Sequence, residues 1–358
     1  MIKEHCFEKE YIRNLRKVYK KANPVFVEKT IYAFELLSLL IKSGMDFVFK
    51  GGTSLLLLLP EPKRLSIDID IVGEIDVSKL DLIIESTKFT KIEPDIRKND
   101  KACIKHFKFY YNSAFEKQQD SNVLLDIVLK KYNYENTQFK LLKTPFFETN
   151  ADIKIKLPFI NSILGDKLTA FAPNTIGIPF DEQSAARKTG ILKQLFDISN
   201  LFDYADNLHE ITSSYKNIHS FECEIRGTDF DLEESLNDSI DTSFLICQSG
   251  LKGSISNNQL AMLRSGCRNL INYLLKETFS LDLAKIPAAK TAFISSAILH
   301  NLKIELNKIR FVSGKIIEIK DFEITGKYKI LNRLKKILPE AFYYWFLISQ
   351  IEKNKSII

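Results

Sequence analysis

The sequence predicts an α+β protein with an N-terminal unit of strands and helices, residues 1–155, and a mainly helical domain, residues 156–358. Two patterns support this prediction. Apart from one predicted hairpin, the segments with the alternation or apolar composition of β-strands lie in the first part of the chain. In the second part, apolar residues recur at helical spacing over several long stretches.

The composition is that of a folded globular protein. Of the 358 residues, 45% are hydrophobic and 27% are charged, which argues against wholesale disorder. The five cysteines are far apart and never in CxxC spacing, so neither a disulfide framework nor a zinc site is expected. The N-terminus lacks the apolar core of a signal peptide, and no apolar segment approaches the roughly 20 residues that cross a bilayer. We therefore expect a cytoplasmic protein with no membrane partner.

The first predicted element is a helix at residues 24–43, where apolar residues recur at helical spacing. Asn23 is placed as its N-cap, Pro24 at its first position and Gly44 just beyond its end. These signals fix both ends of the helix.

A glycine turn separates the next predicted strand and helix. The β-prone run 47–49 stops at Gly51 and Gly52, and the apolar helix 54–59 follows. Glycine allows close backbone approach, and the free N–H groups at the start of a helix attract phosphate. The turn is therefore a candidate triphosphate cradle, and its alternative interpretation is a tight connection with a serine cap.

Residues 64–72 (RLSIDIDIV) alternate strictly between polar and apolar residues and predict a half-buried strand. Asp68 and Asp70 share its polar face, although aspartate is depleted in strands. Mg²⁺ binds carboxylate oxygens together with phosphates and water, and such ions act in nucleotidyl transfer. The pair is therefore a candidate metal site, and the alternative is two carboxylates that face water.

Residues 122–129 (NVLLDIVL) are apolar nearly throughout and predict a central strand with one acid, Asp126, inside it. An unpaired ionised acid in such a strand is costly. A metal shared with Asp68 and Asp70 would satisfy Asp126, and the alternatives are a lysine partner or a turn that it caps.

The C-terminal part is predicted to be helical, with polar loops between the helices and one hairpin at residues 309–319. The predicted helices are 161–171, 185–204, 257–278, 286–306 and 328–351. The aromatic run 341–348 is hydrophobic on all sides, so we expect it to be buried.

The segments KGGTSL (residues 50–55) and RLSIDID (residues 64–70) are similar to the first motif of the AbiEii/AbiGii toxin family. This family includes the MenT toxins and belongs to the DNA polymerase β-like nucleotidyltransferase superfamily. Asp126 corresponds to its third acid, and the similarity in order runs from about residue 24 to 205. The resemblance implies a polymerase β-like core, with a mixed sheet flanked by helices, and a helical domain that completes the NTP site.

The resemblance continues with a lysine-bearing helix, matched by Lys167 in GDKLTAF. A basic residue before a DxxD-like pair is matched by Lys193 and Asp197 in KQLFD, where Gln194 replaces the first acid. From the residues alone, the alternatives are a solvated Lys167 and an ordinary i,i+4 pair between Lys193 and Asp197.

The predicted site combines these segments. Its catalytic residues are Asp68, Asp70, Asp126 and Lys167, and the three acids are the predicted metal ligands. Its nucleotide-binding residues are Lys50, Gly51, Gly52, Thr53, Ser54, Arg64, Ser66, Lys167, Lys193 and Asp197. Mg²⁺ or Mn²⁺ is the expected cofactor, and an NTP is the expected substrate.

The resemblance implies a nucleotidyltransferase toxin of a toxin–antitoxin or phage-defence system. Such a toxin would transfer an NMP from an NTP to an RNA, such as the 3′ end of a tRNA, and would have a cognate antitoxin. Two alternatives remain: nucleotidylation of a partner protein, and a non-catalytic nucleotide- or RNA-binding module. The formal charge of +6 permits RNA without requiring it, and basic stretches at 13–21 and 327–336 are either RNA contacts or solvated helix faces.

Overall fold

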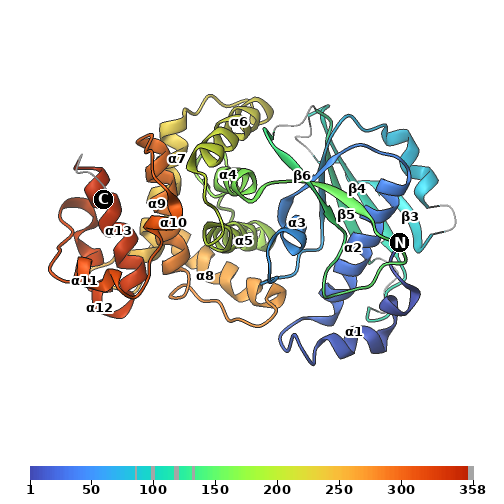
Figure 1. Ribbon diagram of the computed structural model, residues 1–358, viewed down its shortest axis with the longest axis horizontal. Helices are drawn as coiled ribbons and strands as arrows, with labels where there is room; N and C mark the ends of the chain where they lie inside the picture. The colour runs from blue at the N-terminus through green and yellow to red at the C-terminus, as the bar shows by residue number, and fades with distance from the viewer. Residues whose placement is uncertain (85–86, 98–100, 117–120, 131–133, 354–358) are drawn as a thin grey trace. The chain divides into compact units, whose positions relative to one another are not determined.

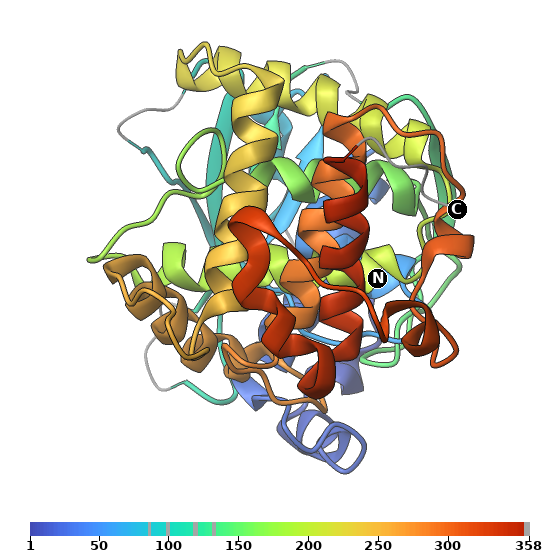
Figure 2. The ribbon, with the colours of Figure 1, turned by 90° about the vertical axis from the view of Figure 1, so that its left-hand side faces the viewer.

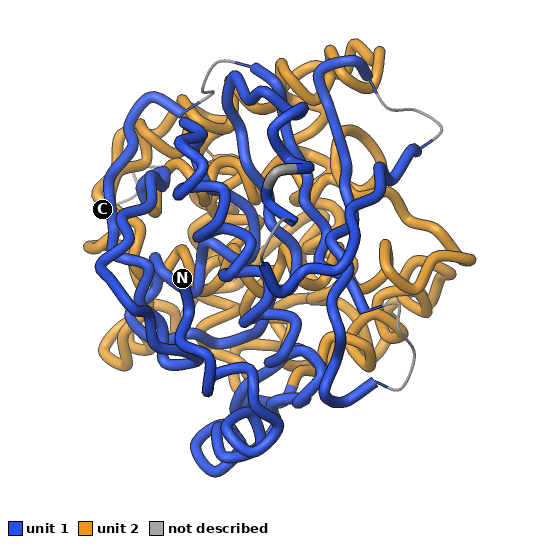
Figure 3. The backbone as a smooth tube through the Cα atoms, turned by 90° about the vertical axis from the view of Figure 1, so that its right-hand side faces the viewer, with its two compact units in different colours: residues 1–159, 272–278 blue, residues 160–271, 279–358 orange. Residues whose placement is uncertain are grey.

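The chain divides into two compact units, which Figure 3 shows in different colours. The first contains residues 1–159 and 272–278, and the second contains residues 160–271 and 279–358. The computed structural model describes residues 1–84, 87–97, 101–116, 121–130 and 134–353. The α+β fold class predicted from the sequence is confirmed.

The first unit contains every strand of the described chain. Its elements, with η marking a 3-10 helix, are η1 (Glu4–Phe7), α1 (Lys9–Leu15), α2 (Pro24–Lys42), β1 (Val48–Lys50), α3 (Gly51–Leu58), β2 (Ile69–Val72), η2 (Val77–Ile83), β3 (Phe89–Pro94), β4 (Ile104–Tyr111), β5 (Asn122–Val128), β6 (Thr137–Leu141) and β7 (Lys154–Pro158).

Five strands form a mixed sheet in the order β1-β2-β5-β4-β3, and β6 and β7 form a separate antiparallel pair. Only the β2–β5 pair of the five-stranded sheet is parallel. Helix α2 lies against this sheet (Figure 1), where the ring of Phe34 contacts that of Phe49 at 6.3 Å between centroids. Ile71 and Ile127, which are fully buried, lie on the same side of their strands as Phe49.

The predicted helix at residues 24–43 is confirmed as α2, including its ends. The Asn23 side chain accepts a hydrogen bond from the Val25 N–H at 3.0 Å, and Pro24 occupies the first turn. Gly44 has φ +78°, a conformation that favours glycine and allows the chain to leave the helix. Local signals were sufficient because each acts within one turn.

The strand predicted at residues 64–72 is shorter than expected. Strand β2 begins at Ile69, and Arg64 instead forms an isolated antiparallel bridge with Leu274. The alternation of polar and apolar residues is present throughout, but the β-ladder depends on which segments lie alongside it. The central strand predicted at 122–129 is confirmed as β5.

The second unit is helical. Its elements are α4 (Ile160–Ala170), α5 (Ala185–Phe202), α6 (Leu208–Arg226), α7 (Leu232–Gln248), α8 (Asn258–Leu270), α9 (Lys285–Leu299), α10 (Leu306–Ile309), α11 (Lys315–Ile319), η4 (Gly326–Arg333), α12 (Leu334–Ile337) and α13 (Pro339–Ile351). The short η3 (Ile271–Tyr273) continues α8 into residues 272–278.

Helices α7, α9 and α13 lie side by side in the second unit, where Figure 2 shows them in yellow, orange and red. The aromatic run at 341–348 is buried there, as predicted: Trp345 is inaccessible and donates from Nε1 to Cys247 Sγ at 3.2 Å. Tyr328 and Phe244 pack against its ring. Among the described residues, no helix is long and apolar enough to cross a membrane.

Several predictions in the second unit are wrong. The segment predicted as a hairpin at 309–319 has no strand: α10 ends at Ile309, residues 310–314 form a connection, and α11 covers Lys315–Ile319. The helix expected at 257–278 ends at Leu270. The regions taken as polar loops contain α6 and α7, which begin at side-chain caps on Asn207 and Asp231. Many of their buried residues are polar, such as Ser214 in α6 and Asp238 and Thr242 in α7, so the apolar periodicity of a helix is weak in both sequences.

Candidate active site

Four polar residues lie in one row across the mixed sheet of the first unit. Three of them are predicted site residues, and the fourth, His106, is not. Lys50 on β1 pairs with Asp70 on β2, and Asp70 pairs with Asp126 on β5. Asp126 in turn pairs with His106 on β4. Paired residues on neighbouring strands point to the same side of a sheet, so these side chains share one face.

Asp126 has protein partners that the sequence did not indicate. His106 Nδ1 lies 2.7 Å from Asp126 Oδ1, and Arg97 Nη2 donates to the same oxygen at 3.3 Å. Arg97 also donates to Asp95, whose pKa is lowered by a hydrogen bond from Lys108 and by Arg97. The predicted partners of Asp126 were a metal, a lysine or a turn that it caps, and no spacing in the sequence relates His106 to Asp126.

The glycine turn is shaped by Asp70. Gly51 has φ +74°, and a Cβ built on it would lie 1.9 Å from Asp70 Oδ2. A Cβ on Gly52 would lie 2.7 Å from Arg64 Nη2 and 2.9 Å from Ser66 Oγ. Gly51 is therefore required by its positive φ and by the Asp70 side chain, whereas a larger residue at Gly52 would displace the ends of Arg64 and Ser66.

The two hydroxyls after the glycines donate to backbone oxygens. Thr53 Oγ1 donates to the Asp68 carbonyl at 2.5 Å, and Ser54 Oγ donates to the Gly51 carbonyl at 2.7 Å. Both residues are fully buried. The Thr53 bond links α3 to the chain just before β2, so it fixes the distance between the turn and Asp68.

Residues 272–278 attach to the segment that precedes β2. The Leu65 N–H donates to the Tyr273 carbonyl at 2.7 Å, and the Leu275 N–H donates to the Lys63 carbonyl at 3.1 Å. Two ion pairs flank this pairing, Lys276–Glu61 at 2.7 Å and Lys63–Glu277 at 3.2 Å. The segment thereby holds Arg64, which is 6% exposed, beside the glycine turn.

Tyr273 is a second residue that sequence reasoning missed. Its ring stacks on Phe26 at 4.5 Å between centroids. Burial raises the pKa of the Tyr273 hydroxyl, the negative charge of Asp68 raises it further, and Arg64 opposes both. Tyr273 therefore lies within electrostatic range of Asp68. The prediction of one continuous helix at 257–278 concealed it.

Lys167 and Asp197 form a buried ion pair within the second unit. Lys167 Nζ on α4 lies 3.2 Å from Asp197 Oδ2 on α5, and their side chains are 8% and 2% exposed. Lys193 is half-buried on α5, one turn before Asp197. The Oε1 atom of Gln194 is buried and has no hydrogen-bond partner in the described part of the chain. The solvated-lysine alternative for Lys167 is wrong.

The acidic row has the chemistry of a divalent-ion site. Asp70 and Asp126 place two like charges side by side, which is unfavourable unless a cation compensates them. Carboxylates are hard oxygen ligands, and Mg²⁺ usually takes one or two of them together with substrate phosphates. Within the described ranges, no three His, Cys, Asp or Glu side chains converge on a metal position. The residues fit an ion that phosphates would complete.

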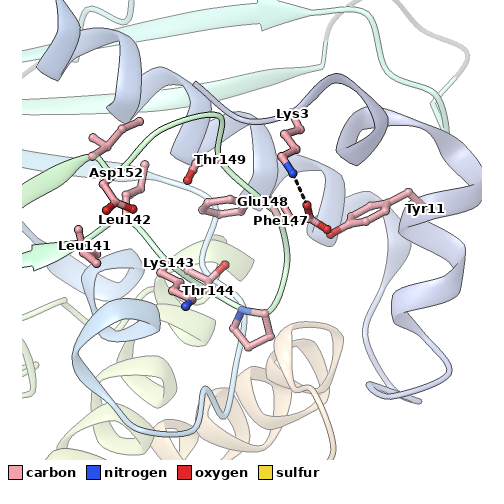
Figure 4. A pocket seen from close by; sticks show the side chains of 12 residues that line it. Lys3, Tyr11, Leu141, Leu142, Lys143, Thr144, Phe147, Glu148, Thr149 and Asp152 are labelled. Atoms are coloured by element: carbon pink, nitrogen blue, oxygen red, sulfur yellow. Dashed lines mark hydrogen bonds and ion pairs between the residues drawn. The ribbon is translucent and has the colours of Figure 1, made fainter.

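A separate cavity of about 430 Å³ lies in the first unit between the N-terminal residues and the chain around β6 and β7. Figure 4 shows the ion pair between Lys3 and Glu148, 2.7 Å long, at one side of it. Its lining includes Tyr11, Lys143 and Asp152, and none of the predicted site residues. Charges of both signs surround the cavity, so it has no clear preference for an anion.

The described chain combines a mixed α+β fold with an acidic row beside a glycine turn. The family model described as "Nucleotidyl transferase AbiEii toxin, Type IV TA system" matches residues 38–243, which is more than half of the chain. The chain therefore belongs to the AbiEii family of nucleotidyltransferase toxins, and the resemblance seen in its motifs is confirmed. Membership implies an NTP substrate and an antitoxin partner.

Several solved structures are distantly similar, among them the following three. JHP933 from Helicobacter pylori has 15% identity and a TM-score of 0.42, with 82% of this chain and 99% of that chain covered. MenT4, a nucleotidyltransferase toxin from Mycobacterium tuberculosis, has 11% identity and a TM-score of 0.48, with 98% and 99% covered. An antigenic nucleotidyltransferase-like protein from Paracoccidioides brasiliensis has 14% identity and a TM-score of 0.35, with 56% and 91% covered. No curated protein matches the chain.

Proposed function

We propose that this toxin transfers an NMP from an NTP, bound with Mg²⁺ or Mn²⁺, to an RNA acceptor such as the 3′ end of a tRNA. The observation that carries the proposal is the pairing of Asp70 with Asp126 directly beside the turn at Gly51 and Gly52. Adjacent carboxylates and a turn at a helix start suit a metal–triphosphate complex. The RNA acceptor follows from the family resemblance.

The proposed roles in the first unit are those that the family resemblance implies for its residues. Asp68, Asp70 and Asp126 are the proposed metal ligands, and the bound ion would neutralise phosphate charge. The backbone N–H groups at Gly51 and Gly52 are proposed to contact the phosphates. Lys50, Arg64 and Ser66 are proposed to contact phosphate or to orient the acids, and Thr53 and Ser54 to shape the turn through the bonds that they donate.

Nucleotidyl transfer forms one P–O bond and breaks another. The acceptor hydroxyl oxygen bonds to the α-phosphorus, the bond to the oxygen bridging the β-phosphate breaks, and pyrophosphate leaves. The proton of the acceptor hydroxyl needs a base. We assign this role to Asp126, because its Oδ2 has no protein partner in the described part of the chain.

Lys167, Lys193 and Asp197 are proposed to contribute to NTP binding. Lys167 is the proposed phosphate ligand, since a compact ammonium suits phosphate oxygens. In that role it would exchange the Asp197 carboxylate, now 3.2 Å away, for a phosphate oxygen.

The test is transfer of label from each α-³²P NTP in the presence of Mg²⁺, total cellular RNA and cellular protein, followed by denaturing gels. Asp70→Asn is run alongside the wild type. Label in RNA with the wild type alone supports the proposal and names the nucleotide. Label in protein would show that the acceptor is a partner protein and not RNA. NTP binding without transfer to RNA or protein would show that the chain is a non-catalytic binding module.

A further inference from the structure

The carboxylate of Asp126 is held at one oxygen and open at the other. His106 Nδ1 and Arg97 Nη2 both meet Oδ1, at 2.7 and 3.3 Å. Within the described ranges, Oδ2 has neither a hydrogen bond nor an ion pair. The side chain of Asp126 is 29% exposed, so the open oxygen is able to meet a ligand.

His106 is the more rigid of the two anchors. It lies on β4 directly opposite Asp126, and its carbonyl accepts a hydrogen bond from the Asp95 N–H at 2.8 Å. Its side chain is only 9% exposed, whereas that of Arg97 is 42% exposed. A nearly buried ring on a paired strand loses little further freedom when it forms a hydrogen bond, unlike a long exposed side chain.

We propose that His106 is a positioning residue for nucleotidyl transfer. Its Nδ1 donates to Asp126 Oδ1 and so turns Oδ2 toward the divalent ion. This inference rests on the proposed function, because it assigns Asp126 to that reaction. Outer partners of ligating carboxylates typically contribute about 10–100-fold to metal affinity or activity, which sets the size of the expected effect.

A purely structural role for His106 predicts a different result. In that case the histidine only compensates the charge of a half-buried acid, and its loss would lower stability without acting through Asp126 on catalysis. Asn is the informative replacement, because its amide nitrogen is as many bonds from Cα as Nδ1 is. His106→Asn can therefore donate to Oδ1, whereas His106→Leu fills similar volume without a donor.

The experiment compares the full-length wild type, His106→Leu, His106→Asn, Asp126→Asn and the double variant His106→Leu/Asp126→Asn. Transfer kinetics give kcat and KM for the NTP, Mn²⁺ titration followed by electron paramagnetic resonance gives metal affinity, and thermal melting checks folding. We expect His106→Leu to lower kcat about 10–100-fold while KM changes less than about threefold. His106→Asn should recover most of this loss, and His106→Leu should have no further effect when Asp126 is already Asn.

Three results would overturn the inference: wild-type kcat in His106→Leu, failure of Asn to restore more than Leu, or a loss that persists in the Asp126→Asn background. Failure of the proposed function looks different, because the wild type itself would then transfer nothing. The Mn²⁺ titration still decides about His106 in that case: weaker binding in His106→Leu than in His106→Asn supports positioning, and equal binding rejects it.

Discussion

Asp70 and Asp126 are paired residues on the parallel strands β2 and β5, so two carboxylates stand side by side on one face of the sheet. Strands that run in the same direction lie about 4.8 Å apart. Such a pair is electrostatically costly by itself and becomes favourable when a divalent cation binds.

Replacement of Asp70 should separate stability from activity. Asp70→Asn removes the repulsion with Asp126 and also any attraction to Lys50, which pairs with Asp70 on β1, so its melting temperature without divalent ions should stay close to that of the wild type. Transfer should fall at least about 100-fold, because a metal ligand is lost. The control is Asp46→Asn, at a side chain that is 79% exposed, which should retain activity. A destabilised Asp70→Asn variant would contradict the repulsion argument.

Gly51 and Gly44 form a matched pair for testing the turn. Both have positive φ, +74° and +78°, but a Cβ at Gly44 would meet nothing within 4 Å, whereas one at Gly51 would meet Asp70 Oδ2. Alanine should cost about 1 kcal/mol of backbone strain at either position. Only Gly51→Ala should also displace the carboxylate and abolish transfer. Equal activity in the two variants would show that the position of Asp70 does not matter.

Removal of one partner of the buried Lys167–Asp197 ion pair should destabilise the protein. Lys167→Met leaves the Asp197 carboxylate, 2% exposed, without this partner and should cost about 3–5 kcal/mol. The double variant Lys167→Met/Asp197→Leu should recover much of that stability, as measured by urea unfolding. If the recovered protein transfers no nucleotide, the charges serve NTP binding, and full activity would assign the pair to folding alone.

Glu35 on α2 gives the protein a pH-dependent stability. The residue is fully buried, its Oε2 accepts the Ile2 N–H at 2.7 Å, and its Oε1 has no partner within the described residues. Burial raises the pKa of this carboxyl above its ordinary value of 4.5, although the hydrogen bond from Ile2 opposes the shift. The folded state therefore binds the proton more tightly than the unfolded state, and stability is lost as pH rises from about 4.5 through the folded pKa.

Glu35→Gln cannot ionise, so its stability relative to the wild type should improve as the pH rises. Urea unfolding at pH 5 and pH 8 measures this difference. The free energy of unfolding of the variant minus that of the wild type should be more positive at pH 8. An equal difference at both values would show that Glu35 does not titrate differently in the two states.

The aromatic ring of Tyr273, and not its hydroxyl, should be needed for nucleotide transfer. Tyr273→Ala removes the stack on Phe26 and loosens the segment that pairs with Leu65, at a cost of about 2 kcal/mol. Transfer should fall at least tenfold at temperatures where the variant is folded, because Arg64 and Asp68 lie on that part of the chain. Tyr273→Phe keeps the ring and should keep most of the activity. Wild-type rates in Tyr273→Ala would exclude a positioning role for residues 272–278.

Local features of the fold and the site were readable from the sequence. The ends of α2 depend on Asn23, Pro24 and Gly44, each of which acts on its immediate neighbours. The glycine turn and the acid in β5 were recognisable from their neighbours in the sequence. Glycine lowers the stability of a strand or helix, and a carboxylate is unfavourable in an apolar strand, so each indicates a specific role at its position. The proposed roles of these residues remain predictions.

The tertiary structure alone decided which distant residues meet. His106 and Asp126 are 20 residues apart, and their contact depends on the register between β4 and β5. Tyr273 reaches the segment before β2 only because α8 ends at Leu270, where a helical pattern continues in the sequence. Propensity and periodicity record interactions within a few residues. Strand register, helix ends without strong caps and buried ion pairs are instead set by packing between segments, which no local pattern encodes.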